Sequence, residues 1–128
     1  MIERIEMPEG TIGFRVHGEI KRSDYTDVLV PALDEEVEKG GGLCQLYVID
    51  RLERMDPAAL WEDARTGFDL GIRRHTDWRR TAIVTDQEWL ASAARLFAWM
   101  APGEVKIYPM ADLEEAKGWV AAGSARSA

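Results

Sequence analysis

The sequence has few of the features that usually indicate a catalytic, nucleic-acid-binding or membrane protein. It contains one cysteine, Cys44, so no internal disulfide can form. It has 16 Lys and Arg against 23 Asp and Glu, and this net charge of −7 lacks the positive excess that binds a phosphate backbone. No apolar run approaches the roughly 18 residues of a membrane span, and residues 1–10 do not form a signal peptide. We therefore expect a cytoplasmic protein with no nucleic-acid partner and no transmembrane segment.

Motifs for catalysis or cofactor binding are also lacking. Gly40–Gly42 follows an expected helix instead of preceding one, so it does not have the position of a phosphate-binding loop. Cys44 lies in the middle of an expected strand, where a thiolate is not stabilised. Asp50, Asp56 and Asp86 could supply oxygen ligands to a divalent cation, although helix capping and loop contacts account for them better. We predict a non-enzymatic protein with no cofactor and no metal; the alternative is a small enzyme that uses Asp50 and Asp86.

What the sequence does contain is a regular alternation of strand and helix patterns. The length of 128 residues and the apolar share of 46% suit one globular domain, expected over residues 1–122, with a flexible tail at 123–128. Two alternating segments joined by Pro8-Glu9-Gly10 predict an antiparallel hairpin. The expected strands are residues 2–7, 11–17, 43–49, 80–85 and 104–108.

Four helices are expected between and after these strands. Pro31 lies inside the first and should bend or divide it, because proline removes a backbone donor. Asp56-Pro57, Thr85-Asp86-Gln87-Glu88 and Asp112 are the expected helix starts. The predicted helices cover residues 21–39, 56–75, 86–100 and 112–122.

The most strand-like stretch, LCQLYVID at residues 43–50, is apolar on both faces except at Gln45. That pattern is typical of an interior parallel strand covered by helices on both sides. The whole pattern predicts an α/β fold with a mixed, mostly parallel sheet of about five strands and about four helices, in which only the first strand is antiparallel. Ligands bind such sheets beyond the carboxyl ends of the strands, so residues 50–56 and 85–88 should share a functional edge with residues 18–23.

The chain resembles the SpoIIAA-like, or STAS/SEC14-type, bacterial domains. The resemblance covers nearly the whole chain and is carried by LYVID at its central strand, by AALWEDARTGFDLGIRRHTDWRRTAIVTDQEWL, and by GEVKIYPMADLEEAKGWV. It implies the α/β fold with a small mixed sheet, used for protein partner switching or for holding lipids and other apolar ligands. Switching members carry a phosphorylatable Ser or Thr after the central strand, whereas residues 50–56 here contain no hydroxyl group. The resemblance therefore does not extend to the phosphorylation switch.

The predicted ligand- or partner-binding site lies at the edge formed by the second and third helices. Trp61 and Trp89 fall in the first turns of these helices, where a ring can line a pocket or anchor a partner; alternatively, the rings only cover the sheet. We predict an apolar or lipid-like small ligand here, and the alternative is a protein partner or a homodimer using the same surface. The site residues are Asp50, Leu52, Met55, Leu60, Trp61, Thr85, Trp89 and Leu90.

Overall fold

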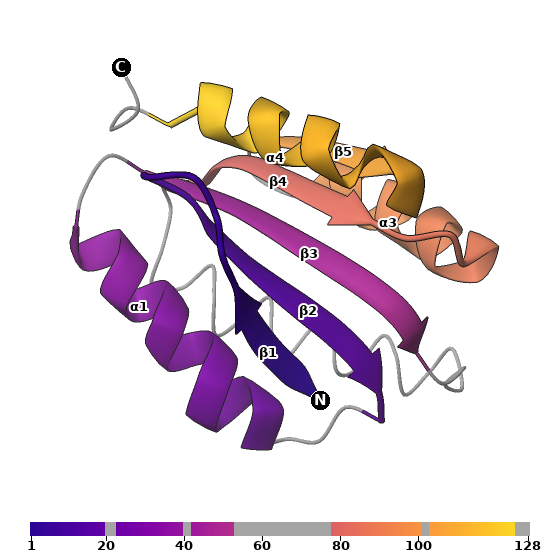
Figure 1. Cartoon of the computed structure of the whole chain (residues 1–128), viewed down its shortest axis with the longest axis horizontal. Coiled ribbons are helices and arrows are strands. Elements are labelled where there is room, and N and C mark those ends of the chain that lie inside the picture. Colours follow the sequence, from indigo (N-terminus) through magenta and orange to yellow (C-terminus); the bar gives the residue numbers. More distant parts are fainter. Residues whose placement is uncertain (20–22, 40–41, 53–77, 101–102, 125–128) are drawn as a thin grey trace.

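A computed structural model describes residues 1–19, 23–39, 42–52, 78–100 and 103–124 of the chain. Within these ranges, five strands form one sheet in the order β1-β2-β3-β4-β5 (Figure 1). β1 is antiparallel to β2, and every other neighbouring pair is parallel. The predicted mixed, mostly parallel sheet is therefore confirmed. Its strands are β1 (Ile2–Ile5), β2 (Ile12–Gly18), β3 (Leu43–Leu52), β4 (Trp78–Val84) and β5 (Glu104–Tyr108).

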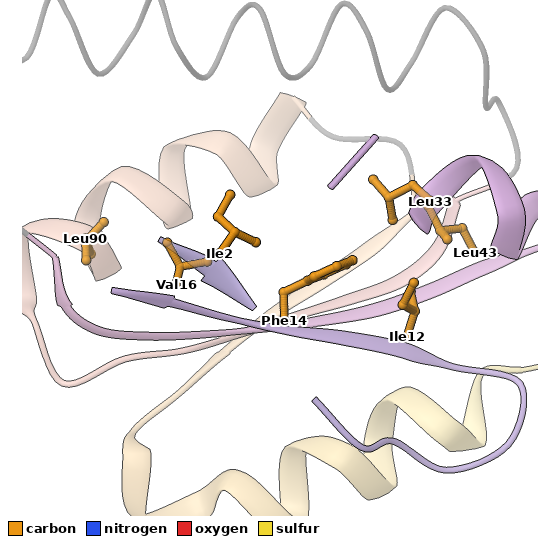
Figure 2. Packing of buried hydrophobic residues seen from close by; sticks show 7 residues of the cluster. All are labelled: Ile2, Ile12, Phe14, Val16, Leu33, Leu43 and Leu90. Atoms are coloured by element: carbon orange, nitrogen blue, oxygen red, sulfur yellow. The ribbon is translucent and has the colours of Figure 1, made fainter. Parts of the chain in front are cut away.

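Helices cover both faces of the sheet. α1 and α3 lie on one face and α4 lies on the other (Figure 2). The π-helix η1 runs directly into α1 close to Pro31, so the interruption expected at this proline is present as a change of helix type. The helix expected over residues 56–75 lies outside the described residues. The described helices are η1 (Asp24–Leu29), α1 (Val30–Glu38), α3 (Glu88–Met100), η2 (Met110–Asp112) and α4 (Leu113–Ala122).

The first face of the sheet packs its apolar side chains against α1 and α3. Alternation along β2 places Ile12, Phe14 and Val16 on this face, as the period of two predicted. Leu33 of α1 and Leu90 of α3 close over them (Figure 2). The buried members of this cluster are Ile2, Ile12, Phe14, Val16, Leu33, Leu43 and Leu90.

Three hydrogen-bonded polar side chains lie on this otherwise apolar face. The Tyr47 hydroxyl donates to Gln45 Oε1 at 2.6 Å, and Gln45 Nε2 donates to Thr81 Oγ1 at 3.1 Å. Gln45 is completely buried, so the absence of either partner would leave a buried amide atom without a hydrogen bond and would destabilise the folded state. Burial raises the pKa of Tyr47, which keeps the phenol protonated as a donor. The Gln45–Thr81 hydrogen bond, which joins β3 to β4, therefore favours the observed register, because a slip of one residue would move Gln45 to the other face.

The second face packs against α4. Cys44, Leu46 and Val48 alternate along β3 with the residues of the first face, and they contact Ala116 and Val120 of α4. β3 therefore buries side chains on both faces, as its apolar sequence predicted, and Cys44 is a buried side chain within this core.

The end of α4 is held by two arginines from the start of β4. Arg80 Nη1 donates to the carbonyl of Trp119 at 2.7 Å, and Arg79 Nε donates to that of Gly123 at 2.7 Å. Cations suit the carbonyl-rich end of a helix because that end carries the negative pole of the dipole. Ser124 is buried beside them. The packed part of the chain therefore reaches Ser124, two residues into the segment that the sequence assigned to the tail.

Two of the expected helix caps take a different form. Asp112 precedes α4 but makes no side-chain capping hydrogen bond, so its predicted capping role is wrong. Asp86 Oδ1 accepts from the backbone N–H of Met110 at 2.9 Å and so joins the segment before α3 to the start of η2. Sequence spacing identified both helix starts, but the hydrogen-bond partners of the carboxylates depend on which loops the sheet brings together.

Two glycines allow a direct test of the packing. Gly103 has φ +81°, and a Cβ there would lie 2.6 Å from the carbonyl oxygen of Trp78; Gly118 in α4 has open space around it. We expect Gly103→Ala to lower the free energy of unfolding by about 2 kcal/mol or more. Gly118→Ala should raise it by about 0.5–1 kcal/mol, because alanine is the better helix former. Chemical denaturation measures both, and equal effects of the two changes would contradict the structure.

Candidate functional site

The carboxyl ends of the four parallel strands gather at one edge of the sheet (Figure 1). His17 is in register with Asp50, and Val48 with Val84. The backbone N–H of Thr85 donates to the carbonyl of Tyr108 at 2.9 Å, which extends the pairing past β4. Gly18, Asp50 and Thr85 therefore share one edge, as the topology predicted.

The predicted site residues differ in their surroundings. Asp50 is about one-third exposed at the end of β3. Thr85 is buried, and its hydroxyl accepts from the N–H of Gln87 at 3.2 Å. Trp89 packs partly buried against the first-face cluster, to which the buried Leu90 belongs. Leu52 ends β3, while Met55, Leu60 and Trp61 lie outside the described residues. A binding role for these eight residues stays a prediction.

A β-bulge at Arg51 shapes the edge between β2 and β3. His17 pairs with Asp50 but Gly18 pairs with Leu52, so Arg51 is an extra residue in β3. It has φ +51°, in the left-handed region that non-glycine residues rarely adopt, and Gly18 opposite it has φ +65°. Consecutive side chains of a regular strand point to opposite faces, whereas a bulge redirects one of them. Asp50 and Arg51 consequently line the same hollow.

This hollow is open, has a volume of about 510 Å³ and is lined by Arg15, His17, Gly18, Asp50 and Arg51. We call it the β2–β3 hollow. Arg15 is paired with Val48 in register, so it stands on the same face as α4. α4 packs against β3 and β4. The hollow lies on the part of that face formed by β2 and the end of β3.

Ion pairs organise the charged groups of the β2–β3 hollow. Arg15 Nη2 donates to Asp50 Oδ2 at 3.0 Å. His17 Nε2 lies 3.7 Å from Glu3 Oε2 of β1 and forms an ion pair when the imidazole is protonated. No acidic side chain in the described part of the chain pairs with Arg51. Among the described residues, the hollow therefore combines two guanidinium groups and an imidazole, and Asp50 is the one carboxylate that lines it.

Asp50 and Asp86 are engaged with different neighbours. Asp50 is turned toward Arg15 of β2, whereas Asp86 accepts from Met110, which follows β5. Among the described ranges, no three His, Cys, Asp or Glu side chains come together as metal ligands. The alternative of a small enzyme that uses Asp50 and Asp86 stays a prediction.

The sequence interpretation did not include Arg15, His17 or Arg51 among the site residues. One signal was available: Arg15 and His17 alternate with Phe14 and Val16, so they stand on one face near the carboxyl end of β2. No comparable signal was available for Arg51, because a bulge depends on the register between two strands.

A second hollow at the opposite edge has a structural role instead. It has a volume of about 340 Å³, and its lining includes Arg79, Arg80, Glu104 and Gly123. A second register shift, where Leu43 pairs with Trp78 and Cys44 with Arg80, makes Arg79 the extra residue. Arg80 donates to the carbonyl of Trp119 in α4, and Arg79 donates to that of Gly123, which directly follows α4. Arg80 Nε also donates to Glu104 at 2.9 Å.

The strand order, the antiparallel β1 and the helices on both faces define an α/β protein with the SpoIIAA-like fold. A solved structure with this fold, an uncharacterized protein from Shewanella loihica PV-4, is similar to the chain with a TM-score of 0.63. The two are 24% identical, and the match covers 94% of this chain and 92% of the other. The SpoIIAA-like family model matches residues 11–121, and the chain belongs to that family, as the resemblance of its sequence predicted.

One comparison with known proteins and one search of the described helices gave negative results. The search of curated proteins finds no match. Among the helices that the structure describes, none combines the length and the apolar character needed to cross a membrane.

The exposure of the Arg15–Asp50 pair predicts a small contribution to stability. A double-mutant cycle with Arg15→Gln and Asp50→Asn should give a coupling energy of roughly 0.2–1 kcal/mol in denaturation, because solvent screens exposed pairs. A coupling above about 2 kcal/mol would contradict the exposure of the pair. The small expected value also means that both variants should fold and be usable in binding experiments.

Proposed function

We propose that this protein is a non-enzymatic binding module whose α3 surface takes part in holding an apolar or lipid-like small molecule. The observation that supports this function is the exposure of two large apolar side chains on one helix. Leu96 is 61% exposed and Trp99 is 87% exposed, and they are three residues apart on α3. Residues at this spacing are neighbours on a helix surface, so together they form one apolar patch.

The apolar patch of Leu96 and Trp99 lies on the same helix as two residues of the predicted site, Trp89 and Leu90. α3 begins next to the carboxyl-end edge with Trp89, which is partly buried against the core, and its outward side carries Leu96 and Trp99 further along. The resemblance to SEC14-type domains, which hold apolar ligands, led to the same helix from the sequence. A ligand bound against α3 would remove this apolar surface from water.

Native mass spectrometry of protein purified without detergent tests this proposal. We expect a retained apolar adduct, and a titration with a fluorescent long-chain fatty acid should saturate at one site. Trp99→Gln should weaken that binding by about tenfold, the loss that corresponds to a contact of about 1.4 kcal/mol. Because Trp99 is exposed, its replacement should leave the melting temperature nearly unchanged.

Ser92→Ala is the matched control, because Ser92 is an exposed residue of α3 whose replacement removes no apolar surface. It should bind the fatty acid as the unmodified protein does. A clean ligand-free mass from a lipid-rich extract, together with no binding of the fluorescent fatty acid, would refute the proposal.

The second candidate is self-association through α3, and the charges on this helix favour it. Glu88 and Arg95 are exposed on either side of Ser92. In an antiparallel pair of α3 helices related by a two-fold axis near Ser92, Glu88 of each copy would face Arg95 of the other. The small side chains of Ala91 and Ser92 at the crossing point would let the two helices approach closely.

Charge reversal separates this candidate from ligand binding. Glu88→Lys should raise the dimer dissociation constant in sedimentation velocity by about fivefold to tenfold, because it places like charges opposite each other. Adding Arg95→Glu should restore the original value, since the pair is then reversed on both copies. A monomer at all concentrations, or a double variant no tighter than the single one, would remove this candidate while leaving the fatty-acid titration unaffected.

A further inference from the structure

We propose that the β2–β3 hollow binds a phosphate group through Arg15 and Arg51, with His17 as a third donor. This site lies on the α4 face of the sheet, opposite the face covered by α3, so it does not depend on the apolar site proposed above. The ligand would be a small phosphorylated molecule or the phosphate headgroup of a lipid. The chemistry of recognition is the same for both sources.

The first argument is the availability of positive charge. The chain as a whole has a net charge of −7, yet two of the five described residues that line the hollow are the arginines Arg15 and Arg51. The two arginines at the opposite edge donate to the carbonyl oxygens of Trp119 and Gly123 and to Glu104. Arg51 forms no ion pair with another described residue. An arginine in such a position is suited to forming charge-assisted hydrogen bonds with a negatively charged ligand.

The second argument is that the backbone is shaped to bring these groups together. Arg51 occupies a left-handed conformation at φ +51°, which is unfavourable for a residue with a side chain. The bulge places Arg51 in the same hollow as Asp50, the residue before it in the chain. Gly18 faces the bulge with φ +65°, and a Cβ built on it would contact no atom of the described residues within 4 Å. Within the described part of the chain, the hollow that Gly18 lines together with the two arginines is therefore open to a ligand.

The geometry favours phosphate over carboxylate. Arg15 comes from β2, Arg51 from the bulge in β3, and His17 lies two residues beyond Arg15 on the same face. The donors therefore come from two neighbouring strands. A phosphate group presents three terminal oxygens in a tetrahedral arrangement and can accept from all three, whereas a carboxylate presents two oxygens in one plane.

Asp50 makes the proposal testable in two directions. Its carboxylate occupies one terminal nitrogen of Arg15 at 3.0 Å and carries the same sign of charge as a phosphate. Asp50 thus competes with the ligand and repels it. Removing this charge should strengthen binding, whereas removing Arg51 should weaken it. Damage to the fold could weaken binding in both variants but could not strengthen it in one.

The experiment is a titration of the full-length protein with inorganic phosphate at constant ionic strength, followed by the amide chemical shifts of residues 15–18 and 50–51. Arg51→Asn, chosen because asparagine tolerates the left-handed conformation, should raise the dissociation constant at least about tenfold, and so should Arg15→Gln. Asp50→Asn should lower it severalfold. Arg4→Gln is the control for net charge: Arg4 is exposed on β1 and is paired with Phe14, on the opposite face.

A parallel assay measures co-sedimentation with vesicles of phosphatidylcholine that contain phosphatidic acid. Saturable phosphate shifts with the predicted order of variants would establish a site for free phosphate compounds. No response to inorganic phosphate, but vesicle binding that Arg51→Asn abolishes and Arg4→Gln preserves, would assign the site to a lipid headgroup. The proposal is overturned if neither probe binds, or if Arg51→Asn and Arg4→Gln have equal effects.

Discussion

The fold depends on the requirement that β3 bury side chains on both of its faces. Leu43 belongs to the cluster under α1 and α3, whereas Cys44, Leu46 and Val48 pack against α4. A strand in this position needs helices on both sides and a fixed register, since a slip of one residue would exchange its two faces. The hydrogen bond from Gln45 to Thr81 of β4 favours that register, because the buried amide of Gln45 meets this partner only in the observed alignment. The positions of the hollow and of α3 follow from this arrangement.

The same arrangement separates two surfaces of different chemistry. The α3 surface carries Leu96 and Trp99, and the β2–β3 hollow on the opposite face carries Arg15 and Arg51. Both lie on elements that adjoin the carboxyl-end edge, where parallel α/β sheets generally bind ligands. The segment after β3 has no hydroxyl side chain between residues 50 and 56. A charge added to this segment by phosphorylation is therefore not how either surface would be regulated.

Much of the fold could be predicted because it depends on local patterns. Alternation in β2, the two-sided apolar run of β3 and the proline-glycine turns identified the sheet, and the helix period identified α1, α3 and α4. The carboxyl-end edge followed from strand direction. What could not be predicted depends on contacts between distant segments: the bulge at Arg51, the Arg15–Asp50 pair, and the bond from Met110 to Asp86. Asp112 has the spacing of a helix cap but lacks the bond, which shows that spacing alone does not determine a partner.

The attachment of α4 by Arg79 and Arg80 has a practical consequence for work with this protein. These contacts hold Gly123 and Ser124 beside the start of β4, at the end of the sheet opposite the β2–β3 hollow. A dye, affinity tag or sensor surface joined to the chain after Ser124 would therefore be anchored on the far side from the strand ends. Immobilised in this way, the molecule would present its carboxyl-end edge to solution, and analytes could reach that edge without passing the support.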